Sequence, residues 1–233
     1  MKKLYLLILV LIAVQGIWAQ QSAQTIIEKY AQKIGGKKAW QALKSYHMEL
    51  DGKAGENQFS SHQYMLKPNC FKMTFKYPER LRVLSYDGIS GYITNNEIPE
   101  EMPKGMETEM REEAEFFDEL ILYKEKRYTT RLERDTIINH KDYYKISLYK
   151  NSKDTQWYYI NKSSYLVEIV EEYSEEKKWN GTLFKTVFDN HRQVQDVKFP
   201  FKISLFANND LLMEYSITRI ELNPQLSKAD FKL

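Results

Sequence analysis

The sequence predicts a mainly β protein with some α-helix, built as one large curved antiparallel sheet of about eleven strands with two small helical elements packed on it. Three observations predict this fold class. Apolar and polar residues alternate along many short segments, nearly all of these segments are joined by short connections, and helical periodicity occurs in only two places. Aromatic residues make up 14% of the chain, including 17 tyrosines, and such residues favour strands over helices.

The clearest strand pattern runs from Cys70 to Tyr77, where Phe71, Met73 and Phe75 alternate with polar residues. Turn-forming sequences separate the later patterns, and Asn-Gly is the strongest short hairpin signal among them. The chain shows no long linker, low-complexity tract or repeat of fixed period, so a single domain is the simplest interpretation. Turns are expected at Asp87-Gly88, Asn161–Ser164, Asn180-Gly181 and Asn208–Asp210.

The first helical pattern lies near the N-terminus. The apolar residues of Ile26–Ile34 fall on one face at about 100° per residue, and Thr25–Glu28 fits a capping box. Lys37–Lys44 (KKAWQALK) predicts a second short helix directly after it. In the middle of the chain, Met106–Leu122 carries apolar residues at spacings of three and four, which predicts a further helix.

A glycine pair followed by lysines stands between the first two helical patterns, in QKIGGKKAW. A phosphate-binding loop of this appearance needs a strand before it, a helix directly after it and a Ser or Thr following the lysine. Here a helical pattern precedes Gly35, and Lys38 occupies the Ser/Thr position. We therefore interpret Gly35-Gly36 as the left-handed turn that ends the first helix and as a hinge between two helices.

Residues 1–19 have the pattern of a signal peptide. Lys2 and Lys3 precede the apolar run Leu4–Val14, whose length matches the roughly 7–15 residues of a signal-peptide core and falls short of the ~20 that span a bilayer. Ala19 is a suitable small residue before a cleavage site. We expect cleavage near Ala19 to leave an exported, periplasmic protein whose single domain covers residues 20–233, with an uncleaved anchor as the alternative.

Charge and cysteine content exclude two classes of protein. The chain has 34 Lys and Arg against 32 Asp and Glu, and loss of Lys2 and Lys3 would balance the two signs. Because a nucleic-acid-binding protein needs a basic excess or a basic patch, we expect no nucleic-acid partner. The lone Cys70 permits no disulfide within the chain, and its place in a strand pattern predicts a small buried residue.

The sequence contains no recognised catalytic or metal-binding motif. No histidine has another at metal-ligand spacing: His47 and His62 lie in strand patterns. His140 and His191 are expected in turns. The acidic run Glu107–Glu115 lacks the residue order of a calcium loop and predicts a solvated helix face. We therefore predict no enzyme activity, no cofactor and no metal site; a hydrolase that uses sequence-distant carboxylates remains an alternative.

A curved sheet that helices cover incompletely leaves an apolar cavity, which is a common site for an apolar ligand. Aromatic and methionine side chains are abundant on the predicted strands. Each of them would serve equally well to fill an ordinary core. The candidate residues for lining a lipid-binding cavity are Trp40, Met48, Tyr64, Phe71, Met73, Phe75, Tyr86, Tyr92, Phe117, Trp157 and Tyr159.

Short motifs follow one another along essentially the whole chain in an order that is typical of one group of envelope proteins. Two of them depart from the usual pattern, with Tyr92 where tryptophan is common and Val197 in place of a glycine. The motifs are Thr25–Tyr30 (TIIEKY), Ile34–Lys37 (IGGK), Lys67–Asn69 (KPN) before Phe71, Tyr86–Tyr92 (YDGISGY), Tyr143–Ile146 (YYKI), Asp196–Pro200 (DVKFP), Ile220–Pro224 (IELNP) and Phe231.

The order of these motifs resembles that of proteins related to the outer-membrane lipoprotein-sorting proteins, which have the LolA/LolB-like fold. The resemblance implies a half-open antiparallel β-barrel whose N-terminal and mid-chain helices form a lid over an apolar cavity. It also implies a periplasmic carrier or binder of a lipid or lipoprotein acyl group, with envelope membrane proteins as further partners. Hiding an acyl chain removes apolar surface worth about 25 cal/mol per Å² from water. The alternative is an envelope structural or protein-interaction module without a lipid ligand.

Overall fold

Residues 22–95, 98–113, 118–150, 155–174 and 179–232 are described in the computed structural model of this chain. The expected signal peptide, its cleavage site and Phe117 lie outside these residues. The first strands are β1 (Ser45–Ala54), β2 (Asn57–Leu66), β3 (Cys70–Tyr77), β4 (Arg80–Tyr86), β5 (Gly91–Asn95) and β6 (Pro99–Glu101). The later strands are β7 (Thr129–Leu132), β8 (Thr136–Ile138), β9 (Lys141–Tyr149), β10 (Thr155–Asn161), β11 (Val167–Tyr173), β12 (Leu183–Val194), β13 (Val197–Ala207) and β14 (Asp210–Leu222).

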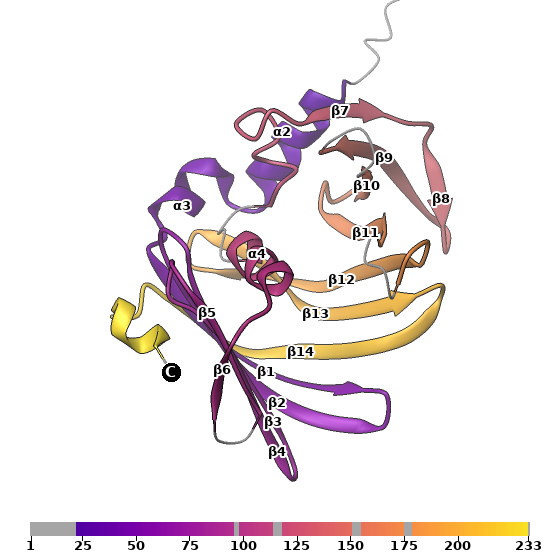
Figure 1. The fold of residues 1–233 in the computed structure, drawn as a ribbon. Helices are drawn as coiled ribbons and strands as arrows, with labels where there is room; N and C mark the ends of the chain where they lie inside the picture. Colours follow the sequence, from indigo (N-terminus) through magenta and orange to yellow (C-terminus); the bar gives the residue numbers. More distant parts are fainter. Residues whose placement is uncertain (1–21, 96–97, 114–117, 151–154, 175–178, 233) are drawn as a thin grey trace, which may run out of the picture.

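All of these strands join one antiparallel sheet in the order β6-β5-β4-β3-β2-β1-β14-β13-β12-β11-β10-β9-β7, with β8 paired to β9. The sheet curves strongly, and its end strands β6 and β7 do not pair with each other, so it is a half-open barrel (Figure 1). The predicted fold class is confirmed. The described residues hold 14 strands rather than about eleven, because β6, β7 and β8 have only 3, 4 and 3 residues and show too little alternation to be recognised.

Strand pairing follows from alternation and turn chemistry. In β1 the apolar side chains of Tyr46, Met48 and Leu50 are buried, whereas His47 and Glu49 between them are half-buried on the other face. The expected turn between β13 and β14 is present, with φ of 48° at Asn208 and 79° at Asn209. Asparagine tolerates this left-handed conformation, which tight hairpins require.

The helices are α2 (Ala23–Lys33), α3 (Gly36–Ala42), α4 (Lys104–Glu113) and the short 3₁₀ helix η2 (Lys228–Phe231). They confirm a helix–turn–helix start. The predicted helix over Met106–Leu122 is confirmed only in its first part, because α4 ends at Glu113 and residues 119–122 form turns. The predicted capping box at Thr25 is wrong, because α2 begins earlier: Ser22 is the N-cap, and its hydroxyl accepts a hydrogen bond from the Thr25 N–H at 3.2 Å. Among the described residues, none of the helices is both long and apolar enough to cross a membrane.

The α2–α3 turn lies directly on the sheet. Gly35 and Gly36 have φ of +113° and +81°, so both take the conformation predicted for them. A Cβ atom on Gly35 would lie 2.1 Å from the carbonyl oxygen of Asp196, at the turn between β12 and β13. The Lys198 N–H donates to the carbonyl oxygen of Ile34 at 3.0 Å. The glycine pair therefore fixes the helices to the sheet as well as ending α2.

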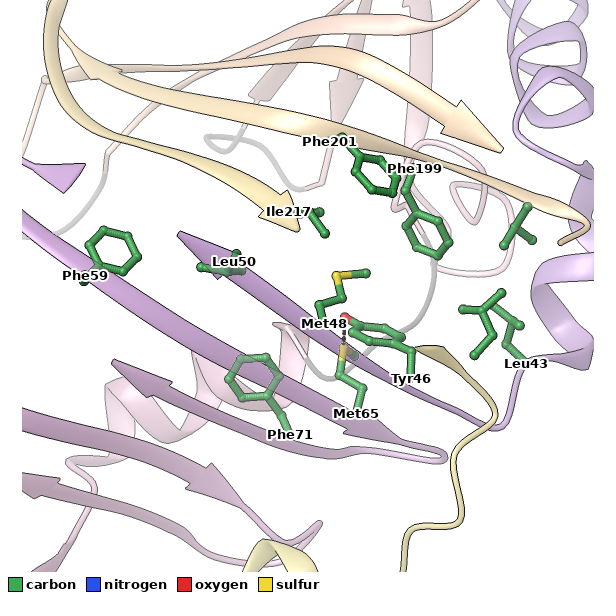
Figure 2. Packing of buried hydrophobic residues seen from close by; sticks show 12 residues of the cluster. Leu43, Tyr46, Met48, Leu50, Phe59, Met65, Phe71, Phe199, Phe201 and Ile217 are labelled. Carbon is green, nitrogen blue, oxygen red and sulfur yellow. Dashed lines mark hydrogen bonds between the residues drawn. The ribbon is translucent and has the colours of Figure 1, made fainter. Parts of the chain in front are cut away.

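Two apolar clusters fill the concave side of the sheet. The first lies on β1–β3, β13 and β14, and Figure 2 shows Met48 and Met65 beside Tyr46, whose hydroxyl donates to the sulfur of Met65. The second joins α2 to β9–β11. Trp40 of α3 packs against both clusters, and its ring centroid lies 4.9 Å from that of Phe199. Helices α2 and α3 thus connect two arms of the sheet, the β1–β3 arm with the first cluster and the β9–β11 arm with the second (Figure 1).

The glycine pair offers a matched test of the docking contact. We expect Gly36→Ala to lower the free energy of unfolding by about 1 kcal/mol, since a Cβ there meets open space and only the positive φ is strained. Gly35→Ala should lower it by about 3 kcal/mol or more, because the new methyl group also collides with the Asp196 carbonyl. Urea unfolding followed by circular dichroism measures both, and equal effects would contradict the docking contact.

Candidate functional site: a cavity beneath the helices

A cavity of about 530 Å³ lies between the helices and the β10–β13 part of the sheet. Its size falls within the roughly 300–1,000 Å³ of ligand-binding pockets. Residues from α2, α3, the segment after α4, the position directly after β9 and four strands, β10–β13, contribute to its wall. The lining residues are Tyr30, Ile34, Trp40, Asp118, Glu119, Lys150, Gln156, Tyr158, Val167, Val170, Glu172, Thr186, Phe188, His191, Lys198 and Pro200.

The apolar part of the wall depends on an irregularity in β11. Tyr158 pairs with Val170 and Tyr159 with Ile169, but the register then shifts, so that Ile160 pairs with Val167. The shift leaves Glu168 without a partner in this ladder, so that two valines an odd number of residues apart face the same side. Both valines line the cavity together with Phe188 of β12. A regular strand would have turned one of these valines to the opposite face.

The polar part of the wall consists of groups that already bind one another. The Tyr30 hydroxyl donates to Asp118 Oδ2 at 2.7 Å, and the Leu120 N–H donates to Asp118 Oδ1 at 2.8 Å. The Tyr158 hydroxyl donates to Gln156 Oε1 at 2.8 Å. The side-chain amide of the same glutamine donates to Glu172 Oε2 at 2.6 Å. These bonds hold the polar side chains along the wall in fixed positions.

A second polar group lies beside Asp118. Glu119 forms ion pairs with Lys150 at 2.5 Å and with Lys126 at 3.3 Å. All three side chains are about one-fifth exposed, with values of 16–22%. The three carboxylates of the wall are therefore each engaged, by a tyrosine, by two lysines or by a glutamine.

Burial shifts the pKa of several lining groups, among them Asp118, Tyr30 and His191. It raises the pKa of Asp118 above its ordinary value, and hydrogen bonds from Tyr30 and Leu120 oppose that rise. It raises the pKa of Tyr30, and the nearby Asp118 carboxyl adds to the effect, so the phenol keeps its proton and remains a donor. Burial also lowers the pKa of His191, which favours the neutral imidazole at the cavity wall.

Of the residues predicted to line a cavity, Trp40 is in the wall. Four others belong to the apolar cluster on the opposite arm of the sheet, namely Met48, Phe71, Met73 and Phe75. Tyr86 is buried directly across from Phe71 in the β3–β4 pair. These side chains pack against one another and do not line the cavity beneath the helices. A second, open pocket of about 890 Å³ lies farther along the same arm, at Phe59, Tyr77 and Tyr215.

The remaining predicted residues lie on the other face of the sheet, except for Phe117, which is outside the residues that the structure describes. Tyr64 stacks on His47, and Tyr92 pairs with Ser85, whose hydroxyl donates to the Phe231 carbonyl oxygen of η2. Trp157 and Tyr159 alternate with the cavity residues Gln156 and Tyr158 along β10, so they face away from the cavity.

Sequence reasoning missed most of the wall. The prediction that His191 lies in a turn is wrong: it belongs to β12, paired with Pro200 of β13, and Asn190 before it takes a positive φ of 55° within the strand. The Asn-His pair resembles a turn because asparagine is common at positive φ. The helical face through Tyr30 and Ile34 was recognisable, but no short-range signal connects it to β11–β13.

Comparison with known proteins identifies the fold. No family model matches this chain, and no curated protein matches it by sequence. A solved LolA superfamily protein from Nitrosomonas europaea is similar over 91% of this chain and 98% of its own, with 15% identity and a TM-score of 0.60. A putative outer membrane lipoprotein-sorting protein domain from Vibrio parahaemolyticus is similar over 91% and 97%, with 13% identity and a TM-score of 0.55.

A third solved structure, a DUF1329 family protein from Desulfovibrio piger, is similar over 90% of this chain and 97% of its own, with 10% identity and a TM-score of 0.56. All three similarities extend over nearly the full length of both partners, so they concern the whole curved sheet and its helices. The chain therefore has the LolA-like fold, as its motifs predict.

Asp118 makes stability depend on pH. Because its pKa is raised on folding, the native protein holds this proton more tightly than the unfolded chain does. That contribution is complete below the unfolded pKa of about 3.9 and is lost as the pH rises through the folded pKa. We expect Asp118→Asn to remove this fall in the free energy of unfolding, as measured by urea titration from pH 4 to pH 8. Asp142→Asn, at an exposed carboxyl on β9, is the control and should keep it.

Proposed function

We propose that this protein is a periplasmic, non-enzymatic carrier or binder of a lipid or lipoprotein acyl group, held in the cavity beneath α2 and α3. The observation that carries the proposal is the cavity itself, about 530 Å³ with apolar walls from Ile34, Trp40 and Phe188. Each buried methylene contributes about 0.8 kcal/mol, so ten of them would supply about 8 kcal/mol. That energy corresponds to a Kd near 1 μM before ordering costs are subtracted.

The mixture of apolar and polar lining supports a ligand with one apolar end and one polar end. Val167, Val170 and Phe188 supply a surface for an alkyl chain. Lys198 and His191 supply nitrogen atoms at the wall, which suit the carbonyl or phosphate oxygens at the head of an acyl group. A pocket with a few placed polar groups on an apolar surface fixes the orientation of its ligand as well as its affinity.

The fold and the N-terminal sequence support an envelope location. One of the solved structures with this fold is a putative outer membrane lipoprotein-sorting protein domain. Residues 1–19 of the present chain have the charge and apolar pattern of a signal peptide. Carriage of an acyl chain through an aqueous compartment needs a concave binding site of this kind, because the exposed chain would otherwise insert or aggregate.

Binding is tested with protein purified from the periplasm without detergent. Native mass spectrometry should show a fraction of the chains with one lipid-sized adduct, and organic extraction should release an acyl-containing molecule. Lipid-free protein should also take up one equivalent of a tripalmitoylated cysteinyl peptide. Protein that is always ligand-free and refuses this probe, and that instead co-purifies with a stoichiometric protein partner, would favour the protein-interaction module.

Filling the cavity should weaken binding without harming the fold. Thr186 of β12 lines the cavity opposite Val170, so Thr186→Trp places a large ring where the acyl chain would lie. Displacing two methylenes costs about 1.6 kcal/mol, and we expect the Kd for the tripalmitoylated peptide to rise at least about tenfold.

The matched control for this variant is Thr129→Trp, the same substitution on the exposed edge strand β7. It should bind the peptide as the unaltered protein does. Circular dichroism and the thermal midpoint establish that both variants are folded. Equal affinity of the two folded variants would place the ligand elsewhere and overturn the assignment of this cavity.

A further inference from the structure

Three potential metal ligands meet on the sheet face that points away from the apolar clusters. They are His47 and Glu49 of β1 and His62 of β2, and one ligand atom from each lies within 4.8 Å of the others. His47 Nε2 is 3.0 Å from His62 Nδ1. This cluster lies on the opposite face of β1 from Tyr46, Met48 and Leu50, so it is separate from the core beneath the sheet and from the cavity.

The β1–β2 hairpin brings these residues together. Its register places Glu49 directly across from His62 and His47 directly across from Tyr64. Side chains two residues apart on one strand share a face, so all three ligands point to the same side. The hairpin lies in the interior of the sheet, because β14 pairs with β1 and β3 pairs with β2. The backbone positions of the ligands are therefore held by hydrogen bonds on both flanks.

The spacing of the two imidazoles fits a shared ion. Zinc binds histidine nitrogen at about 2.0–2.1 Å, and in tetrahedral geometry two such nitrogens lie about 3.3 Å apart. The observed separation of 3.0 Å between the two ring nitrogens needs only a small adjustment to reach it. The ring of Tyr64 stacks on His47 with a centroid distance of 4.3 Å and parallel planes, which restricts the rotation of that imidazole.

The neighbouring charges affect a bound cation in opposite ways: Arg219 competes with it for Glu49, and Glu221 attracts it. Arg219 of β14 lies across from Glu49, and its Nη1 is 3.4 Å from the Glu49 carboxylate oxygen. A metal ion must displace this guanidinium, which is 62% exposed and is also held by Glu221, 3.5 Å from its Nη2. Glu221, across from His47, adds a second carboxylate beside the imidazole and favours a cation there. The net environment remains suitable for a divalent ion.

We propose that His47, Glu49 and His62 form a surface site for a late first-row divalent ion, with zinc as the best match. Two imidazoles and one carboxylate are a ligand set that such ions accept in a three-ligand site, and water would complete the coordination on the exposed side. Both facing nitrogens, His47 Nε2 and His62 Nδ1, would have to be unprotonated to bind the ion, with each ring carrying its hydrogen on the other nitrogen. It would join β1 to β2 by side chains without altering the cavity on the other face.

The test uses the mature protein purified without a histidine tag. Isothermal titration with zinc chloride should show one ion per chain, and the ion should raise the thermal midpoint. His62→Asn and Glu49→Gln should each weaken zinc binding at least about tenfold. Loss of an outer-shell partner already costs about 10–100-fold in metal affinity, and loss of a direct ligand should cost at least as much. His140→Asn removes an exposed imidazole from a remote turn and should leave zinc binding unchanged.

Arg219→Gln separates a defined site from chance binding to a pair of histidines. Removing the competing guanidinium should tighten zinc binding about two- to fivefold, the range expected for one exposed ion pair. Zinc binding that is unaffected by Glu49→Gln, or that depends as much on His140 as on His62, would overturn the proposal. The Thr186→Trp variant should bind zinc normally and His62→Asn should bind the tripalmitoylated peptide normally, so failure here is distinguishable from failure of the proposed function.

Discussion

The contact between the α2–α3 turn and the β12–β13 turn is the constraint on which the rest of the molecule depends. Gly35 can approach the Asp196 carbonyl only because it has no side chain, and the Lys198 N–H then reaches the Ile34 carbonyl. The Trp40 indole N–H donates to the same carbonyl oxygen at 2.9 Å. One short turn thus fixes the position of both helices, and with it the roof of the cavity and the only tryptophan that contacts both described clusters on the concave side.

The two arms of the sheet differ because their inward-facing side chains differ in size. On β1–β3 the inward residues include Met48, Phe71 and Phe75. They pack against one another, so that Met48 and Phe71 are buried and Phe75 is partly buried. On β11 and β12 the corresponding positions hold Val167, Val170 and Thr186, and the space left over is the cavity. The β1–β3 arm is packed near Met48 and Phe71 and has an open pocket of about 890 Å³ farther along, at Phe59 and Tyr77. The more enclosed hollow is the cavity beneath the helices, so the fold combines a packed core with room for a ligand.

Local features of the fold were predictable where short-range chemistry decides them. The alternation in Cys70–Tyr77, the left-handed glycine pair, the Asn208-Asn209 turn and the burial of Cys70, which is 0% exposed, all follow from periodicity and turn preference. The start of α2 at Ser22 and the strand position of His191 did not, because alternative caps and turns were equally compatible with the neighbouring residues. Of the predicted lining residues only Trp40 is in the wall; Tyr30 and Ile34 lie on a helical face that was recognisable, and the other wall residues come from segments between 118 and 200 that no short-range signal connects to the helices.

By itself the sequence determined the class of the fold, the helix–turn–helix start, the absence of recognisable catalytic motifs and a set of ordered motifs that resemble the LolA-like proteins. These properties depend on residues close together in the chain, or on their order along it. The tertiary structure alone decided which face each apolar residue occupies, where the hollow remains, and that Glu49 lies opposite His62. The physical reason is register: shifting a strand by one residue exchanges its two faces, and register is set by bulges and by packing between distant strands.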